Sequence, residues 1–330
     1  MSEPGLSEIV TTTIENRTDK VQDNVTNHNA ISLAMKENDM IETGVSGRSL
    51  IEEMTFDDNG TFTRYTGSQT LNISINPVAT AAEFAPKQFA VAVVINGREK
   101  RMNQGPEGKI KLAAMRIKVA EATLQNNFIA DLVSDGTADG GLQIGGLKLL
   151  ISKTPTVGTV GGIDRSLASS AFYRNYKFDT SADWAGGSSS AANIEALYGG
   201  ILDNTQQDTN APKFALAGKT HYGYVRQAAQ AKQLLTDPKL AKLGFRNTIF
   251  CELPVILGSS INFGGQTQIQ DDLTYFVDPK SIALKVYGGA YFERLEQLQS
   301  INQDAEAQLI IFMGNLTMNR AKTNAVLFDS

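Results

Sequence analysis

The stretch LIEEMTFDDNGTFTRYTGSQTLNISI (Leu50–Ile75) decides what kind of fold this chain of 330 residues adopts. Its two halves alternate β-favouring and polar residues, and Asp58-Asn59-Gly60 lies between them, which predicts a hairpin that closes near Asn76-Pro77. The hairpin is rich in Thr, Ser, Asn and acidic residues, so it cannot cover a core of its own. We therefore expect it to project from the molecule and to need a neighbouring surface.

A strand and a long helix follow the hairpin. The alternating, valine-rich sequence KQFAVAVVI (Lys87–Ile95) predicts the strand. A helix is predicted from Pro106 to Asp135, because proline suits the first helical turn and Gly136 is a natural stop. Its apolar residues recur at three- and four-residue spacing and form one stripe: Ile110, Ala113, Ile117, Ala120, Leu124, Phe128 and Leu132. A projecting hairpin beside such a helix suggests a subunit that is tiled with others.

The rest of the chain is less regular. Residues 1–45 are polar and weakly patterned, which is typical of an arm that lies on another surface. Glycines in residues 136–187 indicate turns. Later patterns predict helices at Ser190–Asp203 and Thr220–Leu235, and strands at Lys213–Ala217, Asn247–Leu257, Ser281–Tyr287 and Ala307–Met318. We expect some of the last strands to return to the sheet beside the long helix.

Composition argues against several function classes. The formal net charge of −5 is unlike that of a general nucleic-acid binder, which is usually basic. The one cysteine, Cys251, permits no intrachain disulfide, and we expect it to be buried in its strand. With only His28 and His221 beside it, a Cys/His zinc site is implausible, and we assign no metal, cofactor or catalytic residue. A cation between subunits at Asp271-Asp272 stays open.

Membrane partners and secretion are not expected either. No segment approaches the roughly 18 to 20 consecutive apolar residues of a membrane span. The first residues, MSEPGLSEIV, have neither the basic start nor the apolar stretch of a signal peptide.

The closest approach to a ligand motif is FALAGKT (Phe214–Thr220). A strand, then Gly218-Lys219-Thr220, then a helix mimics the end of a phosphate-binding loop. That loop needs a glycine five residues before Gly218, and Lys213 stands there. We expect a helix start, and keep a nucleotide-binding enzyme as the alternative from a different class. For His221, near the same helix start, capping or core packing is the default.

In the order of its elements and in its amino-acid sequence, the chain resembles a tailed-bacteriophage major capsid protein of the Hong Kong 97 type. The similarity covers nearly the whole sequence, and its most recognisable stretches are DNVTNHNAIS (23–32), GRSLIEEMTFDDNGTFTRYTGSQTLNI (47–73), AEFAPKQFAVAVVINGRE (82–99), LVSDGTADGGLQIGGLKLLI (132–151), GTVGGIDRSLASSAFYRN (158–175) and QDAEAQLIIFMGNLTMNRAKTNAVLF (303–328). No short motif is diagnostic, but the order of the stretches is specific.

The resemblance implies an α+β fold with named parts. These are an N-terminal arm (1–45), an extended loop that lies over the adjacent subunit (46–86), a peripheral domain (87–179) with a spine helix (106–135), an axial domain (180–292), and C-terminal strands that return to the peripheral domain (293–330). The axial domain of this family gathers around fivefold and sixfold axes.

The implied function is structural. Such a subunit assembles with its own copies into pentamers and hexamers of an icosahedral phage head around double-stranded DNA, and it is not an enzyme. The implied partners are other copies, a portal, scaffolding or decoration proteins, and packaged DNA without sequence preference. The implied location is the virion, after assembly in the host cytoplasm. An encapsulin-like compartment, which holds cargo enzyme, is the alternative with the same fold.

The extended loop departs from the family in one respect. Some members cross-link through a lysine in this loop, but here Lys36 is followed by Lys87 with no lysine between them. We therefore expect a non-covalent shell. We hypothesise that five apolar side chains of the hairpin anchor it on the next subunit: Phe56, Phe62, Tyr65, Leu71 and Ile73.

Overall fold

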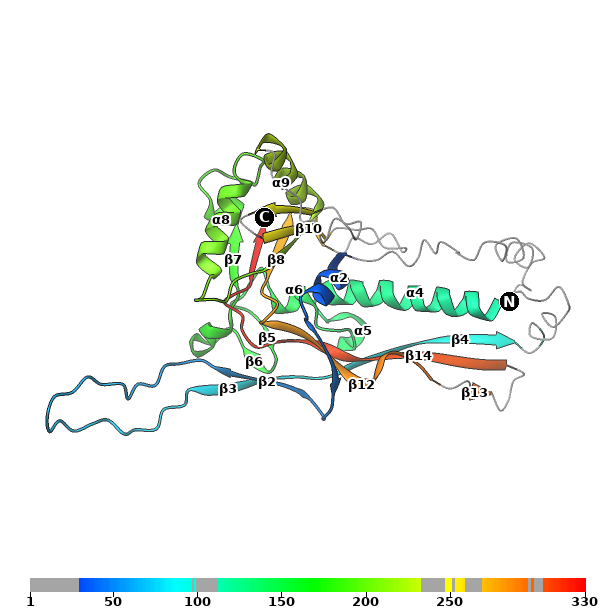
Figure 1. Ribbon diagram of the computed structural model, residues 1–330, viewed down its shortest axis with the longest axis horizontal. Coiled ribbons are helices and arrows are strands. Elements are labelled where there is room, and N and C mark those ends of the chain that lie inside the picture. The colour runs from blue at the N-terminus through cyan, green and yellow to red at the C-terminus, as the bar shows by residue number, and fades with distance from the viewer. Residues whose placement is uncertain are drawn as a thin grey trace.

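The computed structural model describes residues 30–96, 98, 112–232, 247–250, 253–258, 269–295, 298–299 and 305–330. Two sheets organise these residues. A five-stranded sheet lies beside the long helix, a six-stranded sheet carries two shorter helices, and a thin hairpin projects from one end of the molecule (Figure 1). Within the described part of the chain, no helix has the length and apolar character that crossing a bilayer requires.

The five-stranded sheet joins segments from both ends of the chain. Its strands lie in the order β1 (Ile41–Val45), β12 (Ile282–Arg294), β14 (Ala305–Met318) and β13 (Leu298–Gln299), and β4 (Lys87–Asn96) also pairs with β14. The β4–β14 ladder is antiparallel and runs from Lys87 opposite Gly314 to Asn96 opposite Ala305. The predicted strand at 87–95 and the predicted return of a late strand to this sheet are therefore confirmed.

The long helix α4 (Leu112–Val133) lies along β4 (Figure 1). Four residues of the predicted stripe are buried: Ala120, Leu124, Phe128 and Leu132. The Phe128 ring lies 4.9 Å from the Phe312 ring of β14, so the stripe holds the helix on the sheet by aromatic packing. The predicted start at Pro106 lies outside the described residues.

The six-stranded sheet has the order β7 (Tyr176–Asp179), β15 (Ala325–Phe328), β11 (Leu273–Val277), β8 (Phe214–Ala217), β10 (Leu253–Leu257) and β9 (Asn247–Phe250). Helices α8 (Ile194–Thr205) and α9 (Lys219–Lys232) pack beside it (Figure 1). The predicted apolar face of α8 is buried, with Ile194, Leu197, Tyr198 and Ile201 inside. The shorter elements are α2 (Ala30–Glu37), α5 (Ala138–Gly141), α6 (Leu147–Leu150), β5 (Thr159–Val160), β6 (Ile163–Asp164), η1 (Ala168–Tyr173) and α7 (Thr180–Asp183).

The hairpin differs from its prediction. Its strands are β2 (Leu50–Thr55) and β3 (Ala79–Phe84), so the ladder does not fold back at Asp58-Asn59-Gly60. The turn forms only locally, where the Phe62 amide donates to the Asn59 carbonyl oxygen at 3.2 Å. Pairing is confined to the stretch whose inner residues rest on the core: Leu50, Met54, Ala82 and Phe84 are buried. Beyond it, residues 57–75 rest on no other part of the described core.

Three other segments differ from expectation. Residues 30–45 were expected to lie on another surface, but Ile31 and Met40 are fully buried in the main core of this chain. The predicted strand Asn247–Leu257 is two antiparallel strands, with Phe250 opposite Leu253, and Cys251 lies outside the described residues. The expected division at residue 292 put β12 in the axial domain and β15 in the peripheral domain. In the structure β12 instead belongs to the five-stranded sheet beside the long helix, and β15 belongs to the six-stranded sheet.

Candidate intersubunit surface

The segment between β2 and β3, residues 56–78, projects away from the body as two extended halves (Figure 1). These residues form no strand ladder. The hydrogen bonds along their outer part are local, such as that from the Ser74 amide to Asn72 Oδ1 at 3.0 Å. Among the described residues, few peptide groups of this segment have a hydrogen-bond partner.

Four of the five predicted anchor residues lie on this projecting segment with their side chains exposed. Phe62 is 77% exposed and Ile73 89% exposed, and Tyr65 and Leu71 are also open to solvent. The Arg64 guanidinium lies 5.3 Å from the centre of the Phe62 ring, and this is a contact within the loop. Groups of exposed apolar side chains are typical of interaction surfaces. The contact of these residues with a neighbouring subunit stays a prediction.

Ile75 belongs to the same group, although the sequence-based set left it out. Its side chain is 98% exposed. The alternation in Leu71–Ile75, LNISI, places Leu71, Ile73 and Ile75 on one face of an extended segment. That alternation was the signal that could have found it.

Phe56 differs from the other four predicted anchors. It lies at the base of the loop, half-buried, with its ring 5.3 Å from the Phe172 ring of η1. Phe172 is itself well supported, because the neighbouring Tyr173 is buried and donates its hydroxyl to the Met318 carbonyl oxygen at 2.7 Å. Phe56 therefore packs within its own chain.

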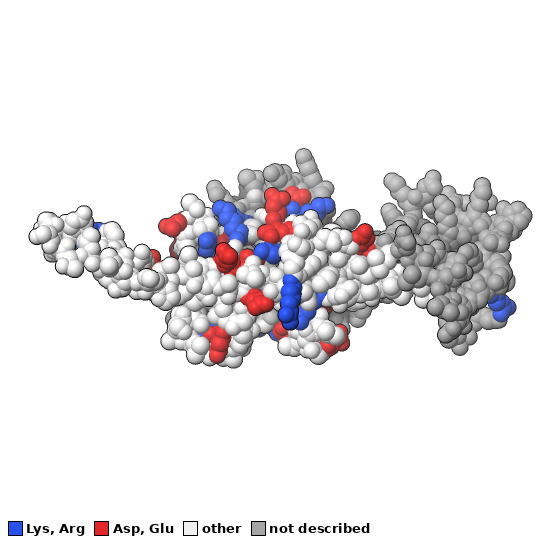
Figure 2. Space-filling view, turned by 90° about the horizontal axis from the view of Figure 1, so that it is seen from below, with Lys and Arg blue, Asp and Glu red and all other residues white. Residues whose placement is uncertain are grey.

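Charged side chains are sparse on the projecting segment. Residues 56–78 contain only Asp57, Asp58 and Arg64. In Figure 2 the thin projection is almost entirely white, whereas Lys, Arg, Asp and Glu are mixed over the body. The loop is therefore suited to contact by shape and apolar area more than by charge.

The base of the hairpin is fixed to the body by polar contacts. Glu52 Oε1 lies 2.7 Å from Lys285 Nζ and accepts a 2.5 Å hydrogen bond from Thr317 Oγ1. On the other strand, the Glu83 amide donates to the Gly161 carbonyl oxygen at 2.9 Å. A Cβ atom on Gly161 would lie 2.8 Å from that of Ala82, so glycine permits this close approach.

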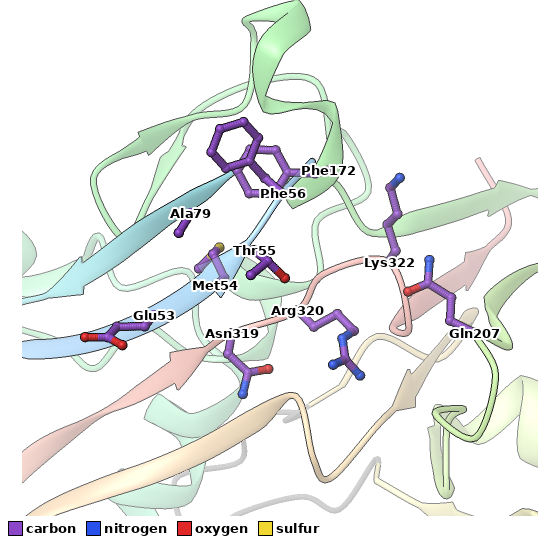
Figure 3. A pocket seen from close by; sticks show the side chains of 10 residues that line it. All are labelled: Glu53, Met54, Thr55, Phe56, Ala79, Phe172, Gln207, Asn319, Arg320 and Lys322. Atoms are coloured by element: carbon purple, nitrogen blue, oxygen red, sulfur yellow. The ribbon is translucent and has the colours of Figure 1, made fainter. Parts of the chain in front are cut away.

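A hollow of about 490 Å³ lies beside the base of the hairpin (Figure 3). It is lined by Glu53, Met54, Thr55 and Phe56 of the first strand and its end, Ala79 of the second, Phe172 and Gln207, and the turn after β14, with Asn319, Arg320 and Lys322. In Figure 3 the aromatic pair Phe56 and Phe172 stands on one side, and Arg320 and Lys322 come from another.

The phosphate-loop candidate is closed by its own backbone. The amides of Thr220 and His221, at the start of α9, both donate to the Asp271 carbonyl oxygen, at 3.1 and 3.4 Å. A Cβ atom on Gly218 would lie 2.0 Å from the Gln270 carbonyl oxygen, so a neighbouring chain segment fills the space a phosphate needs. Lys219 points into solvent.

The acidic pair Asp271-Asp272 stands in this same neighbouring segment. Within the described residues, no three side chains of His, Cys, Asp or Glu come together as a metal site. A cation that is held between subunits at this pair is not tested by the single chain and stays a prediction.

The structure brings together a Ser–His–Asp cluster that has no local sequence signature. Ser189 Oγ donates to Asp329 Oδ2 at 2.5 Å and lies 2.9 Å from His221 Nε2, while His221 Nδ1 lies 3.0 Å from Thr274 Oγ1. Because Ser189 donates its only hydroxyl proton to Asp329, its oxygen acts as the acceptor toward His221, and His221 Nε2 is the donor. In a hydrolase the carboxylate holds the other ring nitrogen and the histidine takes the serine proton. The cluster thus lacks triad geometry.

His221 is completely buried, and burial lowers its pKa below the ordinary 6.5 although the Asp329 carboxylate opposes that shift. Thr274 also contacts the buried Tyr198 hydroxyl at 3.0 Å. The cluster therefore fastens the C-terminal residues to the six-stranded sheet and α8. Its members are far apart in the sequence, which is why sequence analysis did not find it.

Solved structures of other proteins have a similar fold, although no sequence match was found. No protein-family model and no curated protein matches the sequence. Among solved structures, the cyanophage A-1(L) capsid has a TM-score of 0.59 at 13% identity, covering 94% of this chain and 96% of that one. The capsid of the Myoviridae phage XM1 has a TM-score of 0.54 at 12% identity, covering 96% and 98%.

A shell of another kind is similar as well. A chain of the holo-SrpI encapsulin complex from Synechococcus elongatus PCC 7942 has a TM-score of 0.56 at 9% identity, covering 99% of this chain and 96% of that one. The likeness runs along nearly the full length in all three cases. The chain thus has the α+β Hong Kong 97-type capsid fold, as the sequence resemblance predicted.

Proposed function

We propose that this protein is the major capsid protein of a tailed bacteriophage, a structural subunit that assembles into pentamers and hexamers of an icosahedral head around double-stranded DNA. One observation carries the proposal. A chain with the capsid fold over nearly its whole length projects a loop whose apolar residues are exposed and pack on nothing outside the loop among the described residues. A subunit that stayed single would have no use for such a loop.

The parts of the fold keep the roles that the resemblance assigned. Residues 1–45 act as the arm, 46–86 as the loop over the adjacent subunit, 87–179 as the peripheral domain and 180–292 as the axial domain at the symmetry axes, while residues 293–330 return to the peripheral domain. We adjust this division in two respects. Residues 30–45 belong with the body, because Ile31 and Met40 are buried in its core. By sheet membership, β12 belongs with the long helix and β15 with the axial sheet.

Assembly supplies the loop with the stability that its own chain does not. Burying a large apolar side chain contributes about 1.5–3 kcal/mol. Covering Phe62, Tyr65, Leu71 and Ile73 on a neighbour therefore gives each contact a modest gain, and a closed shell repeats it many times. The missing lysine between Lys36 and Lys87 makes these contacts non-covalent.

The acidic balance suits a wall around a genome. A net charge of −5 limits adsorption of DNA to the subunit, so the packaged DNA is held without sequence preference. The remaining partners are a portal and scaffolding or decoration proteins, the location is the phage head, and assembly takes place in the bacterial cytoplasm. The subunit performs no enzymatic reaction.

A second candidate is an encapsulin-like compartment around cargo protein. The similarity to the encapsulin chain, over 99% of this sequence, favours it. The contents of the particle separate the two candidates, because a phage head holds DNA and a compartment holds protein.

The test is to express the full chain and to determine the mass and the negative-stain images of the product. We expect closed shells, or rings of five and six subunits. A monodisperse monomer under every condition, with or without proteins from the same genome region, would overturn the proposal. Shells that hold one protein and no DNA inside the natural host would favour the compartment.

A further inference from the structure

The first strand of the hairpin has a free edge. The Phe56 amide donates to the Val78 carbonyl oxygen at 3.1 Å, which fixes the alternation of the antiparallel ladder. Residues 50, 52, 54 and 56 therefore bond across to β3, and the peptide groups of Ile51, Glu53 and Thr55 point outward. Among the described residues, no strand pairs with β2 on that side.

The outer edge of β3 already makes one hydrogen bond to another segment. By the same alternation, the Glu83 peptide group points away from β2, and its amide donates to Gly161 at 2.9 Å. The hairpin is therefore open to a further strand on the β2 side. A two-stranded ladder is marginal by itself, and an added strand stabilises it.

The hollow beside this edge provides room for the side chains of such a strand. Glu53 and Thr55, whose peptide groups point outward, both line it. Met54, Phe56 and Phe172 form its apolar part, and its other side is polar, with Asn319, Arg320 and Lys322. Figure 3 shows the aromatic pair and the end of β2 on the same side of the opening. By contrast, the edge strand β1 has a register break between Thr43 and Val45, which interrupts a straight pairing edge.

The chain also contains a segment with the sequence pattern of a strand. Leu71–Ile75 alternates so that one face is apolar, yet it pairs with no strand among the described residues, and its apolar side chains are exposed. The Ser74 amide is already satisfied by Asn72 Oδ1. The peptide groups of Leu71, Ile73 and Ile75 point to the other side of the segment and are the ones available to a sheet edge.

We propose that Leu71–Ile75 of one copy adds as a third strand to the free β2 edge of a second copy, with its apolar side chains at the hollow lined by Met54, Phe56 and Phe172. The occupant is a second copy because β3 directly follows this segment on the opposite side of β2, so the segment cannot cross to that edge in its own chain. Strand addition of this kind joins main-chain hydrogen bonds to side-chain pockets. The inference rests on the proposed shell function and specifies its contact.

The contact is head-to-tail, because one copy gives its loop and the next gives its hairpin base. Repeated by rotation, a head-to-tail contact closes a ring, as rings of five or six subunits require. One chain thus carries both halves of the contact without a second type of subunit.

Hydrogen exchange, resolved to single amides, tests the pairing in assembled particles against unassembled subunits. We expect at least about tenfold slower exchange on assembly at Glu53 and Thr55 and at Leu71, Ile73 and Ile75, with little change at Asn72. Particles in which the Glu53 and Thr55 amides exchange as in the free subunit would overturn this inference while leaving the shell function intact. Failure of the wild-type chain to assemble would overturn both.

Proline substitutions give a second, independent readout, because proline removes the amide donor. Ile73→Pro should reduce the yield of particles well below that of Ile73→Ala, which loses the side chain alone. Ser74→Pro, whose amide faces away, should assemble close to the wild type. Equal losses from Ile73→Pro and Ser74→Pro, or equal yields of Ile73→Pro and Ile73→Ala, would contradict strand addition. The segment is exposed in the subunit, so these variants test assembly and not folding.

Discussion

Glu52 of the projecting hairpin and Lys285 of β12 form an ion pair at 2.7 Å, with 13% and 16% of their side chains exposed. The pair links the base of the projecting loop to the five-stranded sheet of the body. The Thr317 hydroxyl shares the same carboxylate oxygen at 2.5 Å. The base of the loop is thus held by a nearly buried polar contact, whereas the side chains of Phe62 and Ile73 in its outer part are exposed.

Removing this ion pair should loosen the hairpin base. Glu52→Gln keeps the side-chain shape but loses the charge, and we expect the free energy of unfolding of the unassembled subunit to fall by about 1–3 kcal/mol. Denaturant unfolding measures it. Glu42→Gln is the matched control: Glu42 is 55% exposed and 3.7 Å from the same Lys285 Nζ, so its loss should change little. Equal effects of the two variants would contradict a special role for Glu52.

Charges placed on the loop should block assembly without unfolding the subunit. Phe62→Asp and Tyr65→Asp put a carboxylate where a neighbour is to cover an aromatic ring, and burying an unpaired charge is strongly unfavourable. We expect a large loss of particles, measured by sedimentation. The unfolding midpoint of the subunit should stay unchanged. If both variants form normal shells, the anchoring hypothesis is wrong.

A matched pair of controls separates loop chemistry from loop position. Ser68→Asp adds the same charge to a small exposed residue of the loop and should assemble better than Phe62→Asp. Phe56→Asp should behave differently from both, because Phe56 packs against Phe172 in its own chain. We expect it to lower the stability of the subunit itself, as measured by thermal unfolding.

His221 should make the subunit sensitive to acid. Burial lowers its pKa in the folded protein below the ordinary 6.5, so the unfolded chain takes up the proton at a higher pH than the folded one. Stability is therefore lost as the pH falls from about 6.5 toward the lower folded pKa, where the imidazole must charge inside the protein. Unfolding free energies at about pH 7 and about pH 5 should differ less in His221→Gln than in the wild type. An unchanged difference would contradict this account.

The Gly218-Lys219-Thr220 segment should respond as a structural turn. Gly218→Ala places a Cβ atom against the Gln270 carbonyl oxygen, and we expect it to lower the free energy of unfolding by about 1–3 kcal/mol. Lys219→Ala changes an exposed side chain and should leave stability and assembly as they are. Loss of particles with Lys219→Ala, or nucleotide binding by the wild type that this variant abolishes, would contradict the structural interpretation.

Sequence patterns predicted the elements that carry their own periodicity. The stripe that includes Leu124 and Phe128 identified α4, and valine alternation identified β4, because each pattern records which face meets a core. The extent of the hairpin ladder could not be read in this way. Leu71–Ile75 alternates apolar and polar residues as a strand does, and only contact with the core, at Met54 and Phe84, decides where pairing stops.

Contacts between distant segments were equally out of reach. Ser189, His221 and Asp329 meet only because the sheet places the last strand, β15, beside β11. The hollow at the hairpin base likewise combines Thr55 with Arg320, which the sequence separates by most of the chain. Leu71 and Ile73 were predictable because their alternation lies within one short segment, and the same alternation extends to Ile75.

The most direct test of the central claim is the structure of the assembled particle, determined by electron cryomicroscopy. The account predicts rings of five and six subunits in which the loop of each copy lies on the next, with Phe62, Tyr65, Leu71 and Ile73 covered by that neighbour. Particles whose loops stand free in solvent, or a protein that never leaves the monomeric state, would contradict it.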